Sequence, residues 1–280
     1  MSNVTDSSSK VKHKTFTLSQ KAISAPQKYR KNEHFSLTHA IRACQRRGTS
    51  ATMPGMKPLT KLGEQQMEDG SMWELWERDG ELSLQHDGLP CATSFTHGSE
   101  DSMAEIATSP ITRATQPCIM IAGLGLGYGL AKAMECLPRE KAKFIVAEPV
   151  AAIVEWNRTH SETKEVWQDR RVSAEIATAA ELCRKRTGSL HAILLRHVHA
   201  RCELSLGDAQ AYFNALKGGS LLAITVAKRD KRLESTLMRA GFEVSTTPVP
   251  ASSKGKQLRM HTVVLARRGR FVPFAERNAK

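Results

Sequence analysis

The sequence is poor in aromatic residues and has no long hydrophobic run. Its 280 residues include three Tyr, four Trp and eight Phe, so an RNA-binding surface built on stacked aromatic rings is not indicated. No run approaches the roughly 18 apolar residues of a transmembrane helix. The N-terminal part also lacks the continuous apolar stretch of a secretory signal peptide. These absences favour a globular protein that works without a membrane.

The spacing of the cysteines argues against a metal site and against secretion. None of the six cysteines belongs to a CxxC pair, and the ligand spacing of zinc sites is absent. Several lie within apolar runs, where a reduced cysteine behaves as a small hydrophobic residue. We therefore expect a cytoplasmic protein without a metal. The cysteines are Cys44, Cys91, Cys118, Cys136, Cys183 and Cys202.

Most of the net charge of +13 lies in the N-terminal segment. Residues 1–60 hold eleven Lys and Arg against Asp6 and Glu33, a net charge of +9. This composition predicts a basic, largely disordered arm over residues 1–70, and it favours a solvated arm over one that binds nucleic acid. An organelle transit peptide is a less favoured reading of the same composition.

Residues 71–98 show the pattern of a small antiparallel β meander. Residues 73–77 and 81–85 alternate between apolar and polar side chains. Asp79-Gly80 and Asp87-Gly88 follow these two stretches, and Asp-Gly is a preferred dipeptide in tight hairpin turns.

Residues 99–280 show the pattern of a Rossmann-like α/β domain. From Pro117 onward, apolar runs alternate with amphipathic segments, which predicts βαβ units and a mostly parallel sheet with helices on both faces. We expect a first helix over 100–108, with Ser99 as its N-cap. The last two strands, between Phe242 and Ala266, lack an intervening helix and predict an antiparallel hairpin. The fold class is therefore α/β, with a sheet of the AdoMet-methyltransferase type.

A glycine-rich turn and an acidic residue predict a nucleoside site. Gly123, Gly125 and Gly127 lie between a predicted strand and a predicted helix, where bare backbone can approach a ligand closely. Glu148 ends the next strand, 21 residues after Gly127, and a carboxylate there can accept hydrogen bonds from both ribose hydroxyls. The alternative is a tight turn beside a solvated glutamate. The Gly-x-Gly-x-Gly spacing and the terminal hairpin favour an AdoMet-type nucleoside over NAD.

These stretches resemble the polyamine aminopropyltransferase (spermidine synthase) superfamily, especially its bacterial spermidine synthase-like branch. The resemblance extends from Trp73 to Arg268 and is carried mainly by Gly123-Leu-Gly-Leu-Gly-Tyr-Gly129 and Val146-Ala-Glu-Pro-Val-Ala-Ala-Ile-Val-Glu-Trp-Asn-Arg158. It implies a small N-terminal β domain, AdoMet or decarboxylated AdoMet as the donor, and transfer of an aminopropyl group to an amine. Since family members are often dimers, it also implies a homodimer.

The sequence departs from this family at the catalytic position. The family's proton-accepting aspartate aligns with Arg196, which cannot act as a base and repels a cationic amine. Glu100 and Glu105 match family acids on the first helix, whereas Thr178 stands where an adenine-contacting acid is expected. The resemblance therefore implies that Glu100 binds the nucleoside. The candidates for catalysis are Glu105, Arg196 and His199.

Three functions are compatible with these residues. The first is a transferase that uses AdoMet or decarboxylated AdoMet and a small acceptor more acidic than a polyamine, because Arg196 and Arg201 flank His197 and His199 with positive charge. The second is a methyltransferase, since methyl transfer depends mainly on positioning. The third is a non-catalytic relative that acts as a binding protein.

Overall fold

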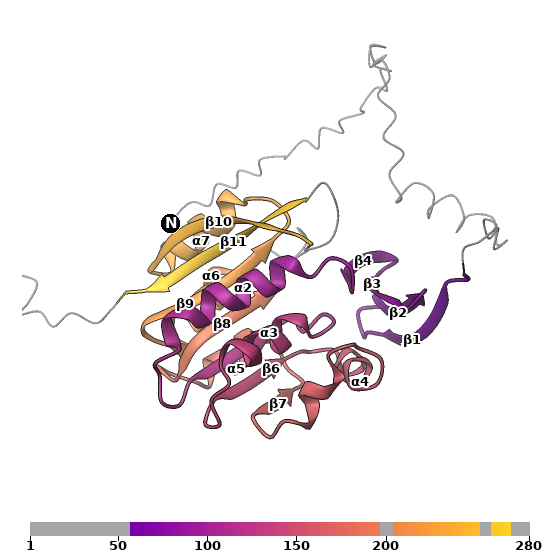
Figure 1. The fold of residues 1–280 in the computed structure, drawn as a ribbon. Coiled ribbons are helices and arrows are strands. Elements are labelled where there is room, and N and C mark those ends of the chain that lie inside the picture. The colour runs from indigo at the N-terminus through magenta and orange to yellow at the C-terminus, as the bar shows by residue number, and fades with distance from the viewer. Residues whose placement is uncertain (1–56, 197–203, 253–258, 270–280) are drawn as a thin grey trace, which may run out of the picture. The chain divides into compact units, whose positions relative to one another are not determined.

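The computed structural model describes residues 57–196, 204–252 and 259–269 (Figure 1). They form a four-stranded antiparallel sheet and a seven-stranded mixed sheet. Most of the basic arm, residues 1–56, lies outside the described residues. Within those described, no helix is long and apolar enough to cross a membrane.

The four-stranded sheet is the predicted meander, in the order β1-β2-β3-β4. Asp79 and Gly80, between β2 and β3, both have positive φ, as the predicted two-residue turn requires. The sheet begins at Thr60, earlier than the predicted start at 71. Strand β1 is mostly exposed and polar, so it carries no alternation from which to predict it. The strands are β1 (Thr60–Gln66), β2 (Met72–Arg78), β3 (Glu81–His86) and β4 (Leu89–Thr93).

The seven-stranded sheet has the order β10-β11-β9-β8-β5-β6-β7. Strands β9, β8, β5, β6 and β7 are parallel, whereas β11 pairs antiparallel with both β9 and β10. The predicted fold class, with its C-terminal hairpin, is therefore confirmed. The strands are β5 (Cys118–Ala122), β6 (Lys143–Ala147), β7 (Val172–Glu175), β8 (Leu190–Arg196), β9 (Leu216–Val226), β10 (Phe242–Pro250) and β11 (Met260–Arg268).

Helices cover both faces of this sheet (Figure 1). One hydrophobic cluster contains residues of α2, α3 and α4, and the other contains residues of α5, α6 and α7. The helices are α2 (Gly98–Thr108), α3 (Tyr128–Cys136), α4 (Ala151–Thr159), α5 (Ala179–Arg184), α6 (Leu206–Ala215) and α7 (Lys231–Arg239), with the short 3-10 helices η1 (Ser109–Ile111) and η2 (Lys164–Gln168).

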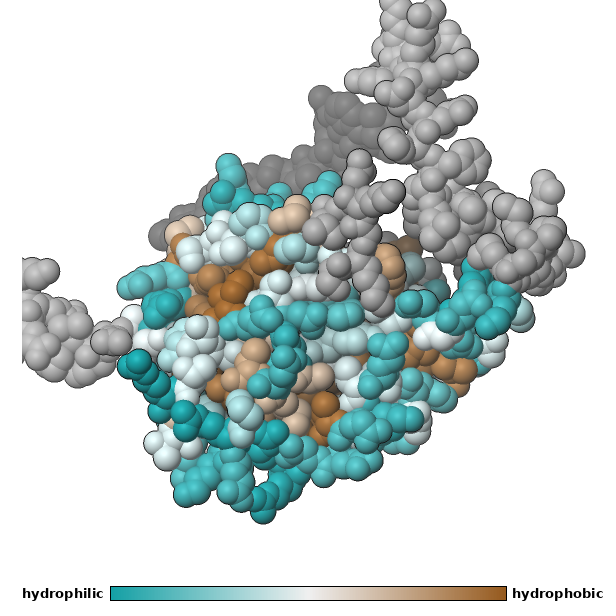
Figure 2. Space-filling model, viewed as in Figure 1, coloured by the Kyte–Doolittle hydropathy of each residue, from teal (hydrophilic) through white to brown (hydrophobic). Residues whose placement is uncertain are grey.

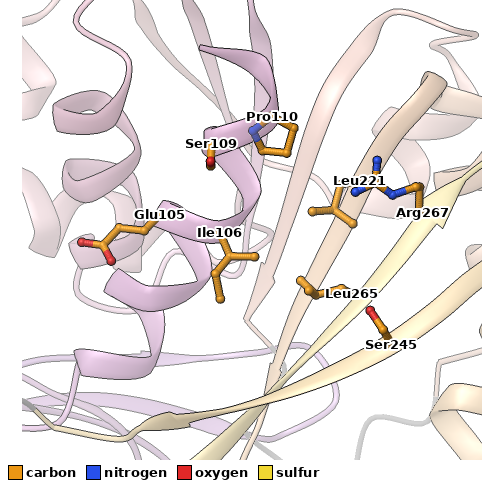
Figure 3. Close-up of a pocket in the computed structure, with 8 residues that line it drawn as sticks. All are labelled: Glu105, Ile106, Ser109, Pro110, Leu221, Ser245, Leu265 and Arg267. Atoms are coloured by element: carbon orange, nitrogen blue, oxygen red, sulfur yellow. The ribbon is translucent and has the colours of Figure 1, made fainter.

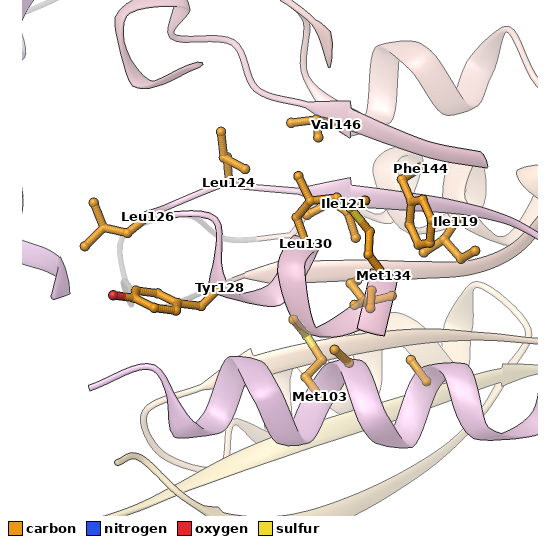
Figure 4. Close-up of a cluster of buried hydrophobic side chains, with 14 of the residues drawn as sticks. Met103, Ile119, Ile121, Leu124, Leu126, Tyr128, Leu130, Met134, Phe144 and Val146 are labelled. Atoms are coloured by element: carbon orange, nitrogen blue, oxygen red, sulfur yellow. The ribbon is translucent and has the colours of Figure 1, made fainter. Parts of the chain in front are cut away.

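The first cluster joins the meander to the large sheet. Leu75, Leu82 and Leu84 of the meander belong to the same buried cluster as Ile119 of β5 and Phe144 of β6. Figure 4 shows the central part of this cluster, between α2, α3 and the strands. The meander and the large sheet therefore share one hydrophobic core.

The predicted N-cap of α2 is wrong. Helix α2 begins at Gly98 with His97 at the N-cap position and no side-chain cap. The hydroxyl of Ser99 instead hydrogen-bonds Nδ1 of His261 at 2.9 Å. A helix cap is predicted from neighbouring residues in the sequence. Here the hydroxyl group forms its hydrogen bond with a residue 162 positions away, which local sequence does not indicate.

The position of Phe144 generates a test of this core. Its side chain is fully buried, and truncation of a buried Phe removes apolar contacts and leaves a cavity. We expect Phe144→Ala to lower the free energy of unfolding by about 3–5 kcal/mol in urea denaturation. Met238→Ala, at an exposed site, is the control and changes stability by less than about 0.5 kcal/mol. Equal effects would contradict the packing described here.

Candidate functional site

The glycine-rich turn lies where ligands bind in open α/β sheets. It follows the carboxyl end of β5, the strand with β8 on one side and β6 on the other. The chain runs from β5 outward through β6 to β7, and then crosses to β8 on the opposite side of β5. Such a reversal of strand order opens a crevice at the carboxyl ends of the strands.

The turn has a backbone that only glycine adopts readily. Gly123, Gly125 and Gly127 have φ angles of 73°, 59° and 84°. Leu124 and Leu126, between them, are buried in the core (Figure 4). The alternating pattern therefore has a physical basis, because the glycines permit left-handed backbone and the leucines anchor the turn.

Polar residues after β6 hold the carbonyl groups of this turn. The side-chain amide of Asn157 donates to the carbonyl of Gly125 at 2.8 Å. The hydroxyls of Ser161 and Thr163 donate to the carbonyl of Leu126 at 2.7 and 3.1 Å. These three residues were not among the predicted site residues. A buried asparagine in an amphipathic helix is the signal that would have identified the first of them.

Glu148 faces the turn from the neighbouring strand, as the sequence predicts. It follows β6 and is only 5% exposed. Its Oε2 accepts a hydrogen bond from the backbone N–H of Leu124 at 3.0 Å, and its Oε1 accepts one from the N–H of Val150 at 3.1 Å. Burial raises the pKa of this carboxyl above its usual value, while the two N–H groups and the charge of Arg196 act in the opposite direction. An ionised carboxylate can accept about four hydrogen bonds, and the described residues donate two of them.

Arg196, at the end of β8, connects three parts of the molecule. Its Nε lies 2.7 Å from Oε1 of Glu100 on α2, and its Nη2 donates to the backbone carbonyl of Cys91 on β4. The two charged side chains are 11% and 7% exposed, respectively. The ion pair is therefore nearly dry, and removal of one charge would leave the other buried without its partner.

The same arginine packs against the glycine-rich turn. A Cβ atom built on Gly125 would lie 3.1 Å from Nε and 3.3 Å from Cζ of Arg196. A Cβ on Gly123 would lie 3.1 Å from the carbonyl oxygen of Arg196. The crevice beside Gly125 thus contains the guanidinium group. A nucleoside can lie across Gly125 only if this side chain moves.

Glu105, by contrast, lies away from the turn. It pairs with Lys132 of α3 at 3.2 Å and lines a cavity of about 510 Å³ beside α2 (Figure 3). Leu221, in the middle of β9, also lines this cavity, whereas Arg196 pairs with Thr225 near the end of that strand. Figure 2 shows apolar residues exposed on this side of the molecule, bordered by hydrophilic ones. The structure therefore brings Glu100 to the turn but not Glu105.

The remaining catalytic candidate, His199, lies outside the described residues, as do His197 and Arg201. Among the residues that are described, no group of three His, Cys, Asp or Glu side chains is arranged to hold a metal ion. Thr178, where the family resemblance implies an acid, forms a capping box with Glu181 at the start of α5.

A second polar cluster next to the turn was not predicted. The ring of His97 stacks on Tyr128, with centroids 3.9 Å apart, and its Nδ1 lies 2.7 Å from Asp101. The hydroxyl of Tyr128 donates to Glu162 at 2.9 Å. Because Tyr128 directly follows Gly127, this cluster borders the start of α3.

Comparison with known proteins supports the fold. No family model and no curated protein matches the sequence. Among solved structures, a spermidine synthase from Thermotoga maritima has a TM-score of 0.60 and 16% identity, over 77% of this chain and 74% of that one. A spermidine synthase in complex with the transition state analogue AdoDATO gives the same values. A structure described as a probable spermidine synthase from Corynebacterium glutamicum has a TM-score of 0.51 and 16% identity, over 78% and 80% of the two chains.

The fold class is therefore that of the methyltransferase-like Rossmann domains. Within that class the chain has a spermidine synthase-like fold. In this chain a small antiparallel sheet precedes the large one. At 16% identity, the likeness shows the fold alone.

The surroundings of Gly127 generate a test with a matched control. An added Cβ would lie 2.5 Å from Oγ1 of Thr163 and 2.7 Å from Oδ1 of Asn157, whereas Gly70, with nearly the same φ, has open space around it. We expect Gly70→Ala to cost about 1 kcal/mol for its backbone conformation alone. Gly127→Ala should cost about 1–3 kcal/mol more, because its neighbours must shift. Urea denaturation of both variants measures the difference, and equal losses would show that the turn is not crowded.

The contact between His97 and Asp101 predicts a pH dependence of stability. The hydrogen bond to Asp101 raises the pKa of His97 above 6.5. The protonated imidazole therefore stabilises the fold fully below about pH 6.5, and this contribution is lost as the pH rises through the raised pKa. We expect Asp101→Asn to lower the free energy of unfolding by about 0.2–1 kcal/mol more at pH 6 than at pH 9.

Glu105→Gln is the control for that experiment. It removes an exposed pairing with Lys132, and the ordinary pKa values of glutamate and lysine side chains lie outside the range from 6 to 9. Its effect should therefore be independent of pH in this range. A pH-independent effect of Asp101→Asn would contradict the assignment to His97.

Proposed function

We propose that this protein is a transferase that binds an AdoMet-type sulfonium nucleoside at the glycine-rich turn. In this assignment Gly123, Gly125 and Gly127 provide the surface for the nucleoside, and Glu148 accepts hydrogen bonds from its ribose. When bound, the nucleoside supplies an activated carbon for transfer to an acceptor. The acceptor is a small molecule other than a polyamine.

The observation that carries this proposal is the orientation of Glu148. A carboxylate buried to this extent is costly unless its hydrogen bonds are satisfied. Two are made within the chain, to the turn itself and to Val150. The acceptor capacity left over lies beside the glycine-rich turn, at the reversal of strand order. These features fit a ribose with two adjacent hydroxyl groups.

The residue at the end of β8 argues against polyamine synthesis. Aminopropyl transfer to an amine needs a group that accepts a proton from the amine. The guanidinium of Arg196 stays protonated at any physiological pH and repels cations. An anionic acceptor is compatible with this charge, whereas a polyamine is not.

A non-catalytic binding protein is the second candidate, and one observation favours it. Arg196 packs over Gly125 and is held there by Glu100 and by the carbonyl of Cys91. If the Arg196 side chain never leaves Gly125, the protein keeps the fold but lacks the transferase activity. A non-catalytic relative can also bind a nucleoside, so the two candidates are separated by turnover: a measured turnover that Glu148→Ala abolishes excludes the second.

The test is isothermal calorimetry of the full chain with AdoMet, decarboxylated AdoMet and methylthioadenosine. We expect at least one of them to bind, and we expect Glu148→Ala to weaken that binding by about tenfold or more, because charge-assisted hydrogen bonds are lost. Glu148→Gln, which retains one acceptor oxygen, should lie between Glu148→Ala and the unaltered protein.

Glu155→Ala is the matched control for these variants. Its side chain on α4 is 62% exposed, so both affinity and thermal stability should be unchanged. Thermal melting shows whether the Glu148 variants remain folded. Failure of all three nucleosides to bind at millimolar concentration would reject the proposal.

A further inference from the structure

The position of Arg196 bears on which nucleoside fits the site. The strand order β8-β5-β6 places Arg196 and Glu148 on opposite sides of the glycine-rich turn. If the ribose lies at Glu148, the substituent on its 5′ carbon extends across Gly125 toward β8. In AdoMet this substituent is the methionine part, with a sulfonium, an ammonium and a carboxylate group.

The pair formed by Arg196 and Glu100 is complementary to that substituent. Arg196 presents a planar array of donors that matches a carboxylate, and Glu100 presents an anion that matches an ammonium group. In the structure the two side chains bind each other at 2.7 Å in a nearly dry environment. The guanidinium group of Arg196 lies against Gly125, in the space that the substituent needs.

We propose that Arg196 and Glu100 recognise the amino-acid end of the nucleoside, and that the site selects AdoMet over its decarboxylated form. This inference depends on the proposed function. On binding, Arg196 leaves Glu100 and pairs with the carboxylate, while Glu100 pairs with the ammonium group. Both buried charges then keep a partner of opposite sign.

A nucleoside without the carboxylate cannot complete this exchange. Decarboxylated AdoMet carries the sulfonium and ammonium charges but no anion. Once its tail separates Arg196 from Glu100, the guanidinium has neither its internal partner nor a ligand carboxylate, and it faces two positive charges at short range. Because the environment contains little water, screening of this repulsion is weak.

Calorimetry with two ligands that differ only in the carboxylate tests the proposal. The unaltered full chain should bind AdoMet about tenfold or more tightly than decarboxylated AdoMet. In Arg196→Gln this ratio of the two Kd values should fall to within about threefold of unity. Arg196→Lys keeps the charge and should retain part of the preference.

A double variant controls for the possibility that Arg196→Gln alone misfolds. Arg196→Gln leaves Glu100 buried without its ion partner, whereas Arg196→Met combined with Glu100→Gln removes both charges and is tolerated better. It too should bind the two nucleosides with similar affinity. Methylthioadenosine, which has no amino-acid end, reports on the ribose and adenine contacts in every variant.

The outcomes distinguish this inference from the proposed function. If none of the ligands, methylthioadenosine included, binds the unaltered chain or the double variant, nucleoside binding itself is rejected. If methylthioadenosine binds but AdoMet is not preferred over its decarboxylated form, the recognition by Arg196 and Glu100 is wrong. A preference that persists unchanged in Arg196→Gln also overturns it.

Discussion

The buried guanidinium of Arg196 is the interaction on which the arrangement of this site depends. It joins the end of β8 to Glu100 on α2 and to the backbone of β4, and it lies against Gly125. Three segments that are distant in sequence therefore meet at one charge. Removal of one partner of a buried ion pair leaves the other charge without compensation in an apolar interior. None of these segments can therefore shift alone without separating Arg196 from a partner.

Local patterns in the sequence were sufficient to predict most of the fold. The alternation of apolar runs with amphipathic segments predicted the parallel sheet, and the Asp-Gly turns predicted the meander. The spacing between Gly127 and Glu148 predicted that Glu148 lies beside the turn, where it contacts the N–H of Leu124, because adjacent parallel strands bring their carboxyl ends together. Strand β1 could not be predicted in this way, since its exposed residues show no periodicity.

The contacts that define the site could not be predicted, because they join residues far apart in the chain. Arg196 meets Glu100 across 96 residues and Cys91 across 105. Arg196 and Glu100 were each identified as candidates from the sequence, but their pairing is visible only in three dimensions. Likewise, the sequence suggested Ser99 as a helix cap, whereas the fold directs its hydroxyl to His261. Family resemblance grouped Glu105 with Glu100, yet only the latter reaches the turn.

The two buried leucines of the glycine-rich turn have a consequence for how specificity can arise. With Leu124 and Leu126 fixed in the core and the carbonyls held by Asn157, Ser161 and Thr163, the backbone forms a rigid socket. A fixed backbone offers the same surface to related ligands, so discrimination among those ligands depends on the side chains that surround the turn. Substitution of a single one of these surrounding side chains can therefore change which ligand is bound while the backbone of the turn stays the same.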